Sequence, residues 1–185
     1  MKMTPIDPPS HLGSAVLLAR QPIAFFCSQS CPGDVILKAQ DWANARGPNN
    51  PPVISGFHTQ VERDVLRILL RGKAPVIHTL ARAVEGARLP TALRIAEKEG
   101  RALILSPFAA SVKRTTSSTS EQRNRYILTQ VSSVLFAHAS NGGKTEILAA
   151  EALTMGLPIF TMQSPSNAHL IIMGAKPISV LENER

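Results

Sequence analysis

Residues 53–80, VISGFHTQVERDVLRILLRGKAPVIHTL, decide the fold class because they read as a strand, a helix and a second strand. Residues 53–56 form a short apolar run that ends in a turn. Thr59 and Glu62 match a capping box, in which a hydroxyl and a carboxylate three residues later satisfy the N–H groups of a first helical turn. Apolar residues then recur at helical spacing, and residues 75–80 are a second apolar run. Two strands joined through a helix predict a parallel pair.

The same alternation continues on both sides of this unit. Further strands are predicted at residues 22–27, 102–106, 134–137 and 158–162, and helices are predicted between them. A second capping box is expected at Ser118 and Glu121. Strands that alternate with amphipathic helices are typical of a parallel sheet covered by helices on both faces. We therefore predict an α/β fold, a three-layer sandwich with a mostly parallel sheet. It would occupy residues 22–181, after a lead-in segment of residues 1–21 and before a tail of residues 182–185.

Composition excludes several classes of protein. The chain has 185 residues, of which 44% are hydrophobic and 18% charged, which is the composition of a globular domain. Two cysteines, Cys27 and Cys31, exclude a disulfide-rich scaffold and are expected to be reduced thiols. The apolar runs are far shorter than the roughly 18 residues that span a bilayer, and residues 15–19 are too short for a signal-peptide core. The sequence therefore predicts a cytoplasmic protein with no membrane partner.

Basic residues outnumber acidic ones and are unevenly distributed. The net charge is +7, with 20 Lys and Arg against 13 Asp and Glu. Residues 1–120 hold 15 basic and 8 acidic groups, whereas residues 121–185 hold 5 of each. Such an excess attracts polyanions without selecting one, so a selective contact has to come from a pocket.

Ligands of open parallel sheets bind at the carboxyl ends of the strands, where the strand order reverses. Four loops follow strands: residues 27–30, 55–59, 106–108 and 140–145. Two of them contain glycine and lead into helices, whose first N–H groups bind phosphate readily. The alternative is that these glycines only make tight connections between strand and helix.

Arginines provide the other candidate contacts. Arg123 and Arg125 flank Asn124 near a predicted helix start, and guanidinium groups match phosphate oxygens. The alternative is an ordinary solvated turn. Arg63, Arg67 and Arg71 recur every four residues and form either a solvated helix face or a phosphate track.

Several kinds of chemistry lack their sequence signals. No GxGxxG follows the first strand, so no dinucleotide cofactor is expected, and Gly143-Lys144-Thr145 lacks the upstream glycine of a P-loop. No cluster has the spacing of metal ligands, and no catalytic residue is assigned. Phe57 and Phe108 are the only aromatic residues placed in these loops, so binding of a nucleic acid would rest on phosphate contacts.

A set of short motifs resembles the DNA processing protein A (DprA) family, specifically its Rossmann-like domain. The matching stretches, in chain order, are the Ser55-Gly56 turn, the Arg123-Asn124-Arg125 triplet, the strand 134–137 with its Ser/Gly turn, and the stretches 156–160 and 167–178. The resemblance covers about residues 22–181. It implies a non-catalytic protein, commonly a homodimer, that binds single-stranded DNA and helps to load a recombinase during natural transformation.

The loop argument and the resemblance together assign contacts with DNA or phosphate to one set of residues. They are Ser28, Ser55, Gly56, His58, Thr59, Arg123, Asn124, Arg125, Asn141, Gly142, Gly143, Lys144 and Thr145. Two stretches depart from the family pattern. Residues 27–29 are Cys-Ser-Gln where the family usually has Gly-Ser-Arg, and residues 58–60 are His-Thr-Gln where it usually has Ala-Arg-Gly.

A second interpretation stays open within the same superfamily. Residues 142–146, Gly-Gly-Lys-Thr-Glu, are partly similar to the glycine turn of phosphoribohydrolases that cleave nucleoside monophosphates. This resemblance implies a domain that binds or hydrolyses nucleotides, with Glu146 acting on the sugar.

Overall fold

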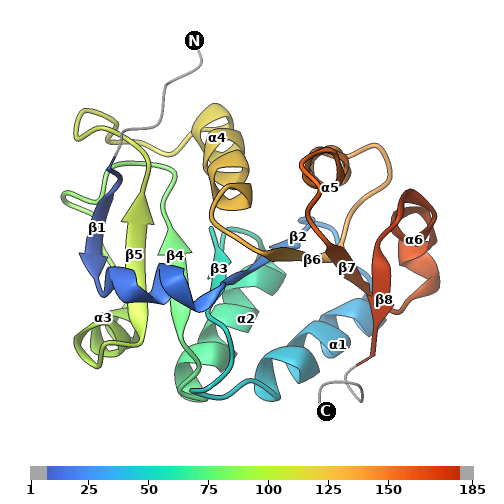
Figure 1. The fold of residues 1–185 in the computed structure, drawn as a ribbon, viewed down its shortest axis with the longest axis horizontal. Coiled ribbons are helices and arrows are strands. Elements are labelled where there is room, and N and C mark those ends of the chain that lie inside the picture. Colours follow the sequence, from blue (N-terminus) through green and yellow to red (C-terminus); the bar gives the residue numbers. More distant parts are fainter. Residues whose placement is uncertain (1–7, 180–185) are drawn as a thin grey trace.

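Eight strands form one sheet in the computed structural model, which describes residues 8–179 (Figure 1). The strand order across the sheet is β1-β5-β4-β3-β2-β6-β7-β8. The strands are β1 (Ser10–Gly13), β2 (Ile23–Cys27), β3 (Val53–Ser55), β4 (Val76–Thr79), β5 (Ala102–Ser106), β6 (Ser133–His138), β7 (Ile159–Met162) and β8 (Lys176–Ile178). Strands β2 to β8 pair in parallel, which confirms the predicted α/β fold with a mostly parallel sheet.

Strand β1 is the exception, and the sequence did not predict it. It pairs antiparallel with β5 at the edge of the sheet, where Ser10 lies opposite Ser106 and Gly13 opposite Leu103. Its four residues carry no apolar alternation, so only the long-range pairing identifies them as a strand. A 3-10 helix, η1 (Ala15–Arg20), follows and buries Leu17. The expected lead-in segment therefore contributes to the sheet, and the predicted tail at residues 182–185 lies outside the described residues.

Helices cover both faces of the sheet (Figure 1). On one face lie α1 (Gly33–Asn44), α2 (Gln60–Arg71) and α3 (Thr91–Lys98); on the other lie α4 (Ser117–Leu128), α5 (Lys144–Thr154) and the short α6 (Ala168–Met173). A second 3-10 helix, η2 (Pro165–Asn167), precedes α6. No helix among the described residues is long and apolar enough to cross a membrane.

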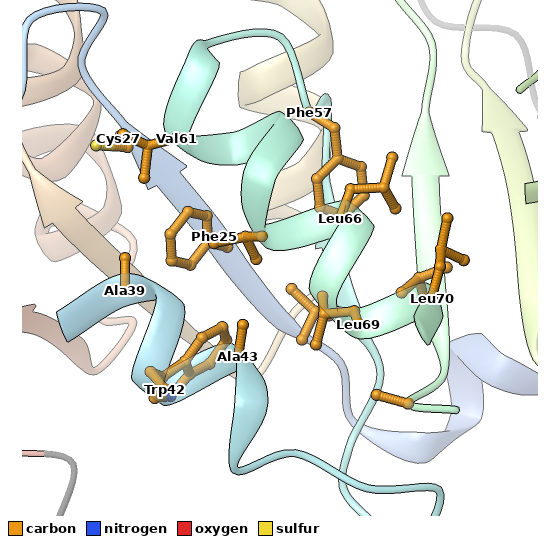
Figure 2. Packing of buried hydrophobic residues seen from close by; sticks show 14 of the residues in the cluster. Phe25, Cys27, Ala39, Trp42, Ala43, Phe57, Val61, Leu66, Leu69 and Leu70 are labelled. Carbon is orange, nitrogen blue, oxygen red and sulfur yellow. The ribbon is translucent and has the colours of Figure 1, made fainter. Parts of the chain in front are cut away.

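Alternating side chains along β2 supply both layers of the core. Phe25 packs against Trp42 of α1 with ring centroids 5.4 Å apart, and Figure 2 shows it between α1 and α2. Its neighbour Phe26 points to the other face and stacks on Phe136 of β6 at 5.5 Å. Because β2 is buried on both sides, its sequence is a continuous apolar run, as expected of a central parallel strand.

Two capping boxes begin helices, and one of them differs from the prediction. The box at Thr59 and Glu62 is confirmed at the start of α2. The box predicted at Ser118 and Glu121 is wrong, because α4 begins earlier and its box joins Thr116 with Thr119. Glu121 lies further into α4, where its carboxylate does not cap the start of the helix.

The order of strands reverses beside β2. Strands β3, β4 and β5 follow one another on one side of β2, and β6, β7 and β8 follow on the other. The helices that follow β2 and β6, α1 and α5, therefore lie on opposite faces of the sheet, and a crevice is expected at the carboxyl ends of these strands.

Candidate functional site

A cavity of about 260 Å³ lies at the carboxyl end of β2, between the first turns of α2 and α5 and one side of α4; we call it the strand-end crevice. It is lined in part by residues that the sequence predicted. These are His58, Thr59, Arg123, Asn124, Arg125, Lys144 and Thr145. Cys27, Glu62, Ser117, Ser120 and Glu121 also line it and were not predicted to contact a ligand. The structure thus brings together residues from loops more than 80 positions apart.

Arg123 is held rigidly on the floor of the crevice. Its side chain is only 5% exposed, Nη1 donates a hydrogen bond to the Thr79 carbonyl at 3.3 Å, and Nε donates one to Asn124 Oδ1 at 2.7 Å. Burial lowers the pKa of Arg123, and the nearby Glu62 opposes that change. The guanidinium lies directly over Gly56, where a β-carbon would overlap Cζ and Nη1. Gly56 is therefore needed for this arginine, not for a tight turn alone.

Glu62 already occupies the N–H groups at the start of α2. Its Oε1 accepts the N–H of Cys27 at 3.1 Å, and its Oε2 accepts those of His58 at 2.7 Å and Thr59 at 3.1 Å. This buried carboxylate ties the end of β2 to the loop after β3. A phosphate would have to displace it to bind the first turn of α2, which makes this turn a poor anion site despite its glycine.

The first turn of α5 is more open to a ligand. Its N-cap is Gly143, which supplies no side chain to cap the helix, and Lys144 and Thr145 line the crevice. One carboxylate lies nearby, because Glu146 accepts the N–H of Gly142. A helix start without a side-chain cap offers N–H groups and a partial positive charge to an anion.

Two cations of the crevice make exchangeable ion pairs. Lys144 Nζ contacts Glu121 at 2.6 Å, and Arg125 Nε contacts Glu151 at 2.8 Å. The hydrogen bond from Lys144 holds the pKa of Glu121 below its usual range. Hydrogen bonding of Arg125 to Glu151 raises the pKa of Arg125. All four groups are partly exposed, where ion pairs contribute little to stability. A bound phosphate can therefore take the place of these carboxylates.

The remaining predicted residues hold the loops rather than line the crevice. Ser28 Oγ accepts the N–H of Ser140 at 2.9 Å, which joins the loop after β2 to the loop after β6. Ser55 is fully buried, and its Oγ accepts the N–H of Phe57 at 3.1 Å. Asn141, Gly142 and Gly143 form the turn that leads into α5, next to the residues that line the cavity.

A second hollow of about 210 Å³ adjoins the crevice and shares His58 and Arg123 with it. Arg63, Arg82 and His78 also line it. Burial, followed by the charge of Arg123, lowers the pKa of His78 to about 4, so this imidazole is neutral at physiological pH. The arginines supply the positive charge of the hollow.

Neither aromatic residue of the predicted loops is available to stack on a base. Phe57 is 4% exposed and packs edge-on against His78, and Phe108 is 3% exposed. Among the described residues, no group of three or more His, Cys, Asp or Glu is arranged to hold a metal ion. The crevice therefore offers cations, hydroxyls and N–H groups, which are partners for phosphate.

Comparison with solved structures identifies proteins of the same fold. DNA processing protein A from Streptococcus pneumoniae matches 94% of this chain with a TM-score of 0.76 at 19% identity, and this chain spans 65% of its length. DNA processing protein A from Helicobacter pylori, described for its single-stranded DNA binding mode, matches 94% with a TM-score of 0.77 at 17% identity and is covered over 83%. The molybdenum cofactor carrier protein of Chlamydomonas reinhardtii matches 86% with a TM-score of 0.55 at 9% identity, and 90% of it is covered.

These likenesses establish the shared fold. No family model matches the chain, and no curated protein matches it in sequence.

Proposed function

We propose that the strand-end crevice binds single-stranded DNA through its phosphates. The observation that carries this proposal is the convergence of Arg123, Arg125 and Lys144 on one cavity at the point where the strand order reverses. The start of α5, which lacks a side-chain cap, adds N–H donors to the same cavity. The fold shared with two DNA processing proteins supports the proposal, since one of them is described as binding single-stranded DNA.

The chemistry of the crevice favours backbone contacts over recognition of bases. Single-strand binders commonly stack bases on aromatic side chains, and Phe57 and Phe108 are buried. A cavity of about 260 Å³ is also just below the range of roughly 300–1,000 Å³ that holds drug-sized ligands. It suits a phosphate with part of its sugar, with the rest of the strand outside. Sequence preference is accordingly expected to be weak.

Within the crevice, Lys144 is the residue best placed to meet a phosphate. It lies in the first turn of α5 and is 70% exposed, so its ammonium is free to leave Glu121. Arg123, in contrast, is fixed by Thr79 and Asn124 and presents a preorganised charge. The loading of a recombinase, the role in transformation and the homodimer stay predictions from the resemblance.

A binding measurement tests the proposal. A short fluorescein-labelled oligothymidine is titrated with protein at about 50 mM and about 200 mM salt, and its anisotropy is recorded. Affinity is expected to fall steeply with salt because phosphate contacts release counterions. Lys144→Ala is expected to weaken binding and to lower the salt slope by about 1. Arg94 is an exposed residue of α3 that does not line the crevice, and Arg94→Ala is the matched control. It is expected to change neither the affinity nor the salt slope. An oligothymidine affinity that does not depend on salt, or equal affinities of Lys144→Ala and Arg94→Ala, overturns the proposal.

The second candidate is binding of a mononucleotide, and the small volume of the crevice favours it. The version in which Glu146 acts on the sugar gains no support, since this carboxylate accepts the N–H of Gly142 and is not part of the crevice lining. Competition by thymidine monophosphate separates the candidates. If the mononucleotide displaces the oligothymidine at an equal phosphate concentration, the mononucleotide is the better ligand.

A further inference from the structure

A groove of about 750 Å³ runs between α2 and α3, outside the strand-end crevice; we call it the α2–α3 groove. Its floor is apolar and comes from both helices. The floor residues are Leu66, Leu70, Pro90, Ala92 and Ile95. Leu66 and Leu70 are mostly covered, whereas Ile95 is 49% exposed and projects from the surface of α3. A contiguous apolar floor with a polar rim is an arrangement that marks protein–protein and ligand-binding grooves.

Cations surround this floor. The charged residues that line the groove, within the part of the chain that the structure describes, are all basic: Arg63, Arg67, Arg71, Lys73 and Arg101. They are five of the 15 basic residues in positions 1–120, so a third of the basic residues in this part of the sequence line one groove. Three of these arginines are spaced by four residues along α2, an arrangement in which like charges destabilise a helix by roughly 0.2–0.5 kcal/mol per pair.

The acidic residues near the groove neutralise only part of this charge. Asp64 pairs with Arg67, and Glu99 pairs with both Lys73 and Arg101. Arg63 instead donates to the carbonyl of His58, and Arg71 donates to the side chain of Asn44. Neither of these last two cations pairs with a carboxylate of the described residues, so both present a positive charge beside the apolar floor.

We propose that the α2–α3 groove binds an acidic amphipathic helix of a protein partner. The apolar face of such a helix would cover Ile95 and the floor, and its acidic residues would meet the arginines. Grooves with apolar floors accept amphipathic helices through anchors spaced by three and four residues, and arginine clusters recognise acidic motifs. The 12 residues of α2 extend over about 18 Å, which matches about three turns of a partner helix.

Two other occupants fit the observations less well. A nucleic acid would satisfy the arginines, but none of the described residues lining the groove is aromatic, so its bases would lie on aliphatic side chains. A second copy of this chain docked by the same face would bring its own row of arginines against this one, and like charges across an interface are unfavourable.

The proposal is tested with a designed probe. A fluorescein-labelled helical peptide carries leucines at positions i, i+3, i+4 and i+7 and glutamates on its other face, and a scrambled peptide has the same composition. The patterned peptide is expected to bind at least tenfold more tightly than the scrambled one. Ile95→Glu and the pair Arg67→Glu with Arg71→Glu are each expected to weaken it at least tenfold. The matched controls Ile172→Glu, on 87%-exposed Ile172 of α6, and Arg94→Glu are expected to bind normally.

The outcomes separate the occupants. Equal binding of the two peptides, or normal binding by Ile95→Glu, overturns the proposal, because the groove would then act only as a patch of charge. If oligothymidine binding falls in the double arginine variant while peptide binding does not, the groove binds nucleic acid and not an acidic helix, which overturns the proposal. Lys144→Ala distinguishes the two sites, because this variant is expected to lose DNA binding and to retain peptide binding.

Discussion

Replacing Gly56 with alanine tests how the floor of the strand-end crevice is built. A β-carbon on Gly56 would overlap the guanidinium of Arg123, which is 5% exposed and donates to the Thr79 carbonyl. The guanidinium of Arg123, at the far end of a flexible side chain, would have to shift away from Gly56, and its hydrogen bond to the carbonyl of Thr79 is expected to be lost. Hydrogen bonds to charged groups contribute about 1.5–3 kcal/mol, so the free energy of unfolding is expected to fall by about 2 kcal/mol.

Urea unfolding and thermal unfolding measure this change. For a chain of this size about 2 kcal/mol corresponds to a fall in Tm of about 6 °C. Gly33→Ala is the matched control, because Gly33 is the first residue of α1 and has open space around it. It is expected to leave stability unchanged or to raise it slightly, since alanine is the better helix former.

A double-mutant cycle assigns the effect to Arg123. In an Arg123→Ala background the added methyl group meets no guanidinium, so Gly56→Ala is expected to cost less than about 0.5 kcal/mol there. The reasoning is refuted if Gly56→Ala is as stable as the wild type, or if it costs the same in both backgrounds. Loss of oligothymidine binding should accompany the loss of stability.

Three further predictions concern Glu62, His78 and the two cysteines. Glu62→Gln is expected to cost about 1–3 kcal/mol in urea unfolding, because its amide nitrogen cannot accept the N–H groups that the carboxylate accepts; unchanged stability contradicts this. The pKa of His78 is lowered to about 4 in the fold, so the unfolded chain binds its proton first. The free energy of unfolding is expected to have its full value above about pH 6.5 and to fall by up to about 3 kcal/mol towards pH 4. His78→Asn should flatten this dependence on pH. Hydrogen bonding with Cys27 lowers the pKa of Cys31 and, with burial, raises that of Cys27; iodoacetamide should modify Cys31 first, as read by mass spectrometry, and equal rates would be inconsistent with this.

Local signals explain what the sequence predicts well. The apolar run of β2, the capping box at Thr59 and Glu62, and the glycines before α5 all act within a few residues, so the sequence predicts α1 to α5, the parallel strands β2 to β7 and the loops at their ends. It does not predict the short α6 and β8. Because parallel strands place all these loops at one edge of the sheet, the general position of the crevice followed from them.

Long-range contacts explain what the sequence does not predict. Glu62 reads as a helix cap, yet its carboxylate also accepts the N–H of Cys27, 35 positions away. Arg123 reads as an exposed ligand contact, yet it is buried over Gly56 and bonded to Thr79. The expected capping box at Ser118 failed because threonine, serine and glutamate offer several overlapping registers, and packing selects the one at Thr116.

The row of arginines on α2 is a further case. Their spacing was compatible with a solvated face or a phosphate track, and neither interpretation included a floor. Only the packing of α3 beside α2 places Ile95 and the leucines between them. A groove formed by two helices has no signature in either helix alone.

An NMR titration of the isotope-labelled chain with a short oligothymidine tests most directly whether the strand-end crevice binds DNA. The amide signals of His58, Thr59, Lys144 and Thr145 are expected to shift together, since these residues line the crevice. The signals of α3 are expected to stay in place. Shifts confined to α2 and α3, or no shift at low salt, would contradict the account.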